Sequence, residues 1–123
     1  MMRYTTLALF AGLCLTACDG GEKKAPADPQ IVAEAKQVWD TRCTTCHGPN
    51  GAGDGPGAAA LQAKPRSFNN GKWQSDTSDD RIKKVIVEGG VAVGLSAEMA
   101  PNPDLKDKPA VVEELLRLVR SFG

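Results

Sequence analysis

The sequence predicts an all-α domain in which about three main helices are joined by long loops. Three segments carry apolar residues at the spacing of one helix face, and each begins at a residue suited to starting a helix. Residues 48–68 lie between the first two of these segments, and their five glycines and three prolines predict irregular structure. The length of 123 residues corresponds to a single domain.

The composition excludes several classes of function. Lysine and arginine number 15, against 15 aspartate and glutamate, so the chain lacks the positive charge of a nucleic-acid-binding protein. The single histidine, His47, excludes an acid–base site built on two histidines. The longest apolar run is shorter than the ~18 residues expected of a membrane-spanning helix. We therefore expect neither a nucleic-acid partner nor a spanning segment.

The start of the chain is predicted to be a lipoprotein signal peptide, residues 1–17. One arginine gives it a positive charge, and a nine-residue apolar run follows from Leu7 to Leu15. The run leads into Leu15-Thr16-Ala17-Cys18, which resembles the bacterial lipobox, where cleavage precedes a cysteine that then carries diacylglycerol. Ordinary secretion with cleavage near Ala17 is the alternative. We expect a lipid on Cys18 and export to the periplasmic side of a bacterial membrane.

Residues 18–28 are predicted to form the lipidated cysteine and a flexible tether. From Asp19 to Asp28 the residues are small, charged or Pro/Gly, a composition that buries little apolar surface. Asp19 resembles an inner-membrane retention signal, which favours the inner over the outer membrane. Cleavage would leave 14 basic against 15 acidic residues. The folded domain is expected over residues 29–123.

The first helix is predicted to begin at Asp28, an N-cap residue, with Pro29 at the first helical position. The residues that recur at steps of three or four, and so form one face, are Val32, Ala35, Trp39, Cys43 and Cys46. This face carries both cysteines that remain once Cys14 leaves with the signal peptide and Cys18 is assigned to the lipid.

These two cysteines stand in the run Cys43-Thr44-Thr45-Cys46-His47. In an exported protein, Cys-x-x-Cys-His is the attachment signature of a c-type haem. Cysteines three residues apart share a helix face, from which both sulfurs reach the two vinyl groups of one macrocycle. His47 follows directly and is predicted to be the proximal ligand of the iron. We therefore predict one covalent haem c, bound through Cys43 and Cys46.

Three other interpretations of these residues are weaker. A structural zinc site needs four ligands, and the mature chain offers three here, with no second histidine and no further free cysteine. A thioredoxin-type redox pair requires a βαβ setting, which the flanking sequence does not show. A structural disulfide leaves the adjacent His47 unexplained.

With this motif the chain resembles a class I monohaem cytochrome c of the kind carried on bacterial lipoproteins. The resemblance covers nearly all of residues 33–122. The matching segments are Val38-Trp39, Cys43 to Gly48, Gly51 to Pro56, Lys64 to Phe68, Gly89-Gly90, Gly94 to Ser96, Met99 and Val119 to Phe122. The resemblance implies the cytochrome c fold, in which loops wrap around the haem.

The glycine-rich segment 48–68 is consistent with a domain built around a haem. A long irregular segment argues against a small compact domain unless something else fills the interior. The mature chain has only four aromatic residues, and a flat apolar macrocycle would supply the missing core. One helical turn is expected at Ala58 to Leu61. Leu61 and Phe68 are candidate haem contacts or ordinary loop anchors, and the resemblance implies that a carbonyl in the Gly55-Pro56 region holds the proximal imidazole.

The second main helix is expected from the cap residue Ser78 to Glu88, with Gly89 as a left-handed stop. Its expected buried residues are Ile82, Val85 and Ile86. The third is expected from about Lys108 to Phe122, with glutamates early and arginines late, which suits the helix dipole. Its apolar face comprises Val112, Leu115, Leu116, Val119 and Phe122.

The resemblance also implies that the first and last helices pack together, with Trp39 against Leu115 or Val119. Trp39 and Phe122 are therefore expected to be structural. Four residues are candidates for contact with the haem propionates, although a solvated surface is the alternative for the lysines: Lys64, Arg66, Lys72 and Trp73.

Met99 is the only methionine left after the signal peptide and lies in an irregular, Gly- and Pro-rich stretch, residues 94–103. Its thioether is predicted to be the second axial ligand, which raises the reduction potential and leaves no open site. A flexible core filler is the alternative. The family often places proline directly after this methionine, whereas here Ala100 intervenes.

A haem closed by histidine and methionine exchanges single electrons and has no place for a substrate. We therefore expect a membrane-tethered electron carrier, not an enzyme, acting between redox proteins. Candidate partners are a quinol–cytochrome c oxidoreductase, a terminal oxidase or a periplasmic reductase or dehydrogenase. The alternatives are a haem enzyme or gas sensor with a displaceable Met99, and an electron-relay subunit of a fixed oxidoreductase complex.

Overall fold

The computed structural model describes residues 28–123, so the predicted signal peptide, Cys18 and the tether up to residue 27 lie outside the described residues. Within residues 28–123 there is no β-strand, and the all-α prediction is confirmed. The helices are α1 (Pro29–Val38), α2 (Thr44–His47), α3 (Gly71–Asp76), α4 (Asp79–Glu88) and α5 (Pro109–Arg120), and the 3₁₀ turns are Ala58–Ala60, Val91–Val93 and Pro103–Leu105. None of the described helices is long and apolar enough to cross a membrane.

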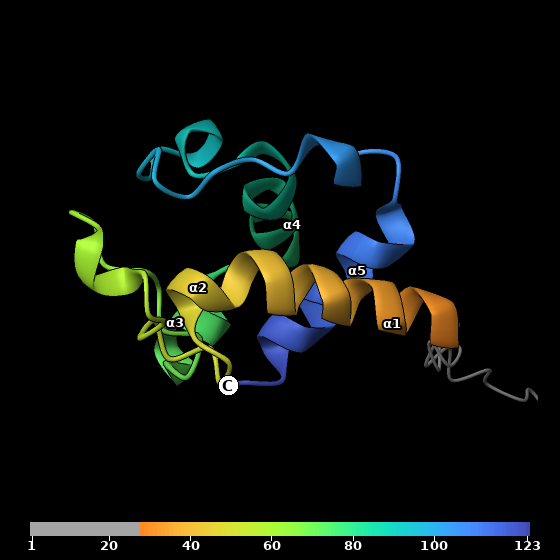
Figure 1. Ribbon diagram of the computed structural model, residues 1–123, viewed down its shortest axis with the longest axis horizontal. Coiled ribbons are helices and arrows are strands. Elements are labelled where there is room, and N and C mark those ends of the chain that lie inside the picture. The colour runs from red at the N-terminus through yellow and green to blue at the C-terminus, as the bar shows by residue number, and fades with distance from the viewer. Residues whose placement is uncertain (1–27) are drawn as a thin grey trace, which may run out of the picture.

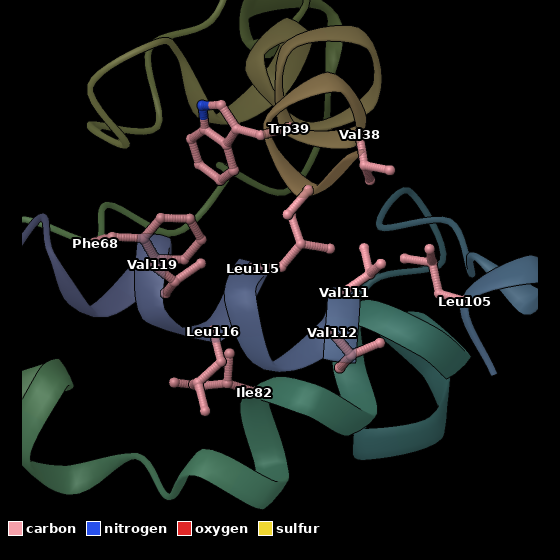
Figure 2. Packing of buried hydrophobic residues seen from close by; sticks show 11 residues of the cluster. Val38, Trp39, Phe68, Ile82, Leu105, Val111, Val112, Leu115, Leu116 and Val119 are labelled. Atoms are coloured by element: carbon pink, nitrogen blue, oxygen red, sulfur yellow. The ribbon is translucent and has the colours of Figure 1, made fainter. Parts of the chain in front are cut away.

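α1 and α5 cross and pack against each other at the centre of the domain (Figure 1). α1 begins as expected, because the Asp28 carboxylate accepts a hydrogen bond from the backbone N–H of Gln30 at 2.8 Å. Trp39 is 4% exposed and belongs to the same buried cluster as Leu115 and Val119. Figure 2 shows Leu115 reaching from α5 toward Trp39. The expected packing of the first and last helices is therefore present.

The predicted core face of α1 was wrong at Val32, which is 39% exposed. Ala35 and Trp39 of the predicted face are buried, and the core-facing residues of α1 itself are Ile31, Ala35 and Val38. Their steps of four and three fit one helix face as well as the predicted set does, and Val32 lies one position off this stripe. Two adjacent apolar residues at the start of the helix made both registers compatible with the sequence.

The first helical segment also changes its winding before the cysteines. Trp39–Cys43 forms a π-helical turn, in which the N–H of Thr44 donates to the Trp39 carbonyl five residues back. The hydroxyls of Thr41 and Thr44 donate to the carbonyls of Gln37 (2.7 Å) and Asp40 (2.8 Å). A π turn holds more residues than an α turn, so it rotates Cys43 relative to Trp39 from the position that uniform α-helical spacing predicts.

The glycine-rich loop folds back along the end of α2. The N–H groups of Gly53, Gly55 and Gly57 donate to the carbonyls of His47 (2.8 Å), Cys46 (3.1 Å) and Thr45 (2.7 Å), in that order. These carbonyls have no partner inside so short a helix, and the loop supplies one for each. The expected helical turn is present as the 3₁₀ turn Ala58–Ala60.

α4 and α5 form largely as predicted. The Ser78 hydroxyl accepts from the N–H of Arg81 (3.3 Å), and α4 ends at Gly89, whose φ is +79°. Ile82 is buried and faces Leu116 of α5 (Figure 2), whereas Val85 and Ile86 are only half-buried. α5 ends two residues earlier than predicted. Its buried residues are Val111, Val112, Leu115, Leu116 and Val119.

α3 was not predicted. The Asn70 side chain accepts from the N–H of Trp73 at 3.0 Å and starts the helix. Six residues are too few to show a periodic apolar face. α3 matters because it fixes Phe68: the Gln74 side-chain amide donates to the carbonyls of Phe68 (2.8 Å) and Val119 (2.9 Å), joining the loop to α5.

Candidate haem-binding site

A cavity with an apolar lining lies between α2, α5 and the loop that carries Met99. The cavity is partly open to solvent. The lining residues are Val38, Trp39, Cys43, His47, Phe68, Ile86, Met99, Asn102, Leu115 and Val119. The structure thus brings Cys43, His47 and Met99, which are separated by up to 56 positions, to one space.

His47 is 9% exposed, and its Nδ1 lies 3.1 Å from the backbone carbonyl oxygen of Arg66. Burial lowers the pKa of His47, and the bond to the Arg66 carbonyl acts in the opposite direction. A neutral imidazole then donates Nδ1–H to Arg66 and leaves the lone pair of Nε2 for a metal. This arrangement fixes the tautomer and the ring plane of a proximal ligand.

The prediction of which backbone carbonyl accepts the hydrogen bond from His47 was wrong. The Gly55-Pro56 region does not hold the imidazole, because the carbonyl of Gly55 accepts from the N–H of Ala58 (2.9 Å) within its own turn. The acceptor is Arg66, eleven residues further along the same loop. The sequence contains no signal for this choice, since every residue offers a backbone carbonyl.

Phe68 stacks on the imidazole, with ring centroids 4.6 Å apart and an angle of 19° between the planes of Phe68 and His47. The Phe68 ring also packs at tilted angles against the rings of Trp73 (centroids 5.2 Å apart) and Trp39 (6.2 Å). The aromatic contacts hold the His47 ring from the side, while Arg66 holds it through Nδ1. Phe68 lines the cavity as predicted for a haem contact, whereas Leu61 is not among the lining residues.

Cys43 and Cys46 are half-buried free thiols on consecutive turns. The Sγ of Cys43 lies 3.9 Å from the Val38 carbonyl oxygen, and burial raises the pKa of this thiol to about 11. Among residues 28–123, no group of three or more His, Cys, Asp or Glu side chains is placed to hold a metal ion. The zinc interpretation therefore finds no ligand set in the described domain.

Met99 is held at the cavity by the end of α4. The N–H of Gly90 donates to the Met99 carbonyl at 2.9 Å, and the N–H of Met99 lies 3.3 Å from the Ser96 carbonyl. A Cβ on Gly90 would lie 2.2 Å from the Ser96 oxygen and 3.2 Å from the Met99 Cβ, so only glycine allows the loop to close so tightly. The Gly89-Gly90 pair thus sets the position of Met99.

Comparison with known families settles the assignment. The sequence model of the Cytochrome c family matches residues 32–111, about two thirds of the chain. The chain belongs to the cytochrome c family. No curated protein and no solved structure matches it. As a class I cytochrome c it binds one covalent haem c and acts as a haem-based electron carrier.

The residues of this cytochrome c fit such a group. The cavity wall is apolar, and the free thiol of Cys43 lines it, whereas the free thiol of Cys46 is not among the lining residues. A neutral imidazole with one free nitrogen lines the same space as a thioether. These are the donor types that c-type haem requires. Three of the four candidate propionate contacts line a second, shallow hollow that is open to solvent: Arg66, Lys72 and Trp73, together with Asn70 and Asp76.

Two residues that the sequence did not indicate support the loop that carries Met99, residues 90–99, called the Met99 loop below. Asn102 donates from its side chain to the Ile86 carbonyl (2.8 Å) and from its backbone to the Val87 carbonyl (3.0 Å). Glu98 accepts from the N–H groups of Ala63 and Gln62, which lower the pKa of its carboxyl group. Both contacts join segments distant in the chain, and no spacing in the sequence indicates them.

Proposed function

We propose that this cytochrome c is a membrane-tethered one-electron carrier whose haem is attached through Cys43 and Cys46 and whose iron is ligated by His47 and Met99. The observation that supports this most directly is the placement of His47 and Met99 on one apolar cavity beside Cys43. With both axial positions filled, the iron has no open site for substrate or gas.

The bound haem supplies the one-electron redox couple, and the protein's residues determine its environment. Hydrogen bonding of His47 to Arg66 orients the proximal imidazole and keeps Nε2 unprotonated. The thioether of Met99 favours the reduced iron and raises the potential. The apolar side chains around the cavity keep water from the cofactor, so little solvent reorganises when the electron moves.

The proposed tether begins at Cys18, where a lipid would hold the domain on the periplasmic side of the bacterial inner membrane. The sequence that supports it is the lipobox-like Leu15-Thr16-Ala17-Cys18 after a short apolar run. The proposed partners are redox proteins of the same membrane or of the periplasm: a quinol–cytochrome c oxidoreductase, a terminal oxidase, or a reductase or dehydrogenase.

Carbon monoxide binding tests the closed iron. The reduced wild-type protein is expected not to bind CO, and Met99→Ala is expected to bind it, to have a lower potential and to keep the helix content of the wild type. The visible spectrum and far-UV circular dichroism measure these properties. CO binding by the native protein would favour the haem enzyme or gas sensor instead.

A further inference from the structure

Glu98 directly precedes Met99 and reaches across to another loop. Its Oε1 accepts from the backbone N–H of Gln62 at 2.9 Å, and its Oε2 accepts from the N–H of Ala63 at 3.0 Å. The hydroxyl of Ser96 lies 3.1 Å from the same carboxylate. One side chain therefore takes both N–H donors of a short turn, 35 and 36 positions earlier in the chain.

The turn that Glu98 holds belongs to the loop that supports the proximal side of the site. Four residues after Gln62, the carbonyl of Arg66 holds the imidazole of His47. In Figure 1 this turn and the loop that follows α4 lie at the same end of the molecule, away from the start of α1. The carboxylate of Glu98 thus joins the segment behind one proposed axial ligand to the segment that carries the other.

Apart from the bonds of Glu98, the hydrogen bonds that hold the Met99 loop to the rest of the domain involve α4. Within residues 90–99, the other hydrogen bonds run inside the loop, as from Gly90 to Met99, or to α4, where Arg81 donates to the Val93 carbonyl at 3.1 Å. Just beyond this segment, Arg42 donates to Asn102 (3.3 Å) and Asp104 (2.9 Å). Without Glu98, no hydrogen bond would join residues 90–99 to the Gln62–Ala63 turn. Bonds to an ionised carboxylate are the stronger kind of hydrogen bond.

We propose that Glu98 is a positioning residue for Met99: its carboxylate fastens the Met99 loop to the Gln62–Ala63 turn and so keeps the thioether on the haem iron. The inference rests on the proposed function, in which Met99 is the second axial ligand. The loop has two states, closed with Met99 bound and open with the sixth position free, and Glu98 stabilises only the closed state.

Holoprotein variants test this, with imidazole as the competing ligand. Glu98→Ala removes both acceptors and is expected to bind imidazole at least about tenfold more tightly than wild type, which corresponds to ~1.4 kcal/mol. Its reduction potential is expected to fall. Glu98→Gln keeps one acceptor oxygen, so its imidazole affinity should lie between the two. Glu88→Ala is the matched control, because it removes the same charge at the end of α4 from a side chain that pairs only loosely with Lys84 (4.0 Å).

Each result decides the proposal. If Glu98→Ala keeps the imidazole affinity and the reduction potential of the wild type, Glu98 does not position Met99. A lower melting temperature with unchanged imidazole affinity would likewise show that Glu98 is merely structural. In either case the Met–iron band of the wild type would still support the proposed function. A wild type without that long-wavelength band would refute Met99 ligation and this inference with it, before any variant is made. If Glu98→Ala does not accumulate haem, Glu98→Gln gives the answer by the same titration.

Discussion

Gly55 shows how one residue sets the path of the loop beneath the haem site. Its N–H bonds to the Cys46 carbonyl, and a Cβ at this position would lie 2.3 Å from the carbonyl oxygen of Thr44 and 2.4 Å from that of Thr45. These are backbone atoms of the haem motif itself, which cannot move aside without moving the two cysteines. The position therefore requires the absence of a side chain.

We predict that Gly55→Ala lowers the free energy of unfolding of the holoprotein by about 1–3 kcal/mol, the range for overpacking a tight site. Gly71→Ala is the control, because a Cβ there meets no atom within 4 Å, and its effect is expected to stay below about 1 kcal/mol. Chemical denaturation of both variants measures the difference. Equal stabilities would show that the loop does not need to lie against α2.

At the scale of elements, the end of α5 is fastened to α3 and α4 by one arginine. Arg120 is 27% exposed in its side chain and donates to the Asp79 carboxylate, to the carbonyl of Thr77, and to both the backbone and side-chain oxygens of Gln74. Gln74 in turn bonds to the Phe68 carbonyl, and Phe68 stacks on His47. The network links the last helix to the proximal side of the site.

Arg120→Ala is expected to lower the free energy of unfolding by about 2–4 kcal/mol, because several partly buried oxygens lose a charged donor. Arg120→Lys should recover less than half of this loss, since an ammonium group cannot match the planar fork of the guanidinium. Lys106→Ala, which removes a positive charge from an exposed side chain, serves as the control. Thermal unfolding followed by circular dichroism measures the three melting temperatures. Equal melting temperatures for all three variants would contradict the role of the network.

The elements also show what the sequence could and could not predict. The boundaries of α4 followed from Ser78 and Gly89, because caps and stops are encoded by residue type. The π turn Trp39–Cys43 and the short α3 were missed, since neither produces a periodic pattern. The haem motif was predicted from its residue types and spacing, and Met99 from its place in a Gly- and Pro-rich stretch. The sequence could not indicate the Arg66 carbonyl that bonds to His47, because every residue has a backbone carbonyl. It could not indicate the bond of Glu98 to Gln62 either, because that contact joins two loops that only folding brings together.

At the scale of the whole molecule, the charge balance and the proposed tether would determine how the carrier meets its partners. The mature chain would carry 14 basic against 15 acidic residues, and no large net charge would steer it over long distances. The proposed tether of about ten residues would reach only ~15–20 Å if it behaved as a flexible coil, which would keep the haem domain near the membrane. Effective concentrations at this distance reach the millimolar range.

Cys18→Ser is predicted to leave the haem spectrum unchanged, to release the domain from membranes and to slow respiratory electron flow in intact cells sharply. More than one acyl chain on Cys18 would anchor the native protein stably, and serine cannot accept them. Membrane fractionation and oxygen uptake measure both effects. A Cys18→Ser protein that stays with the membrane would indicate that a resident complex holds the domain in place of the lipid.

The most direct test of the account is the visible spectrum of the purified protein, oxidised and reduced, before and after extraction with acidified acetone. We predict a c-type spectrum in the reduced state, haem that stays with the polypeptide because Cys43 and Cys46 hold it, and a long-wavelength Met–iron band in the oxidised state. Haem that extracts into the solvent would contradict attachment at these cysteines. A five-coordinate, high-spin spectrum would contradict ligation of the iron by both His47 and Met99.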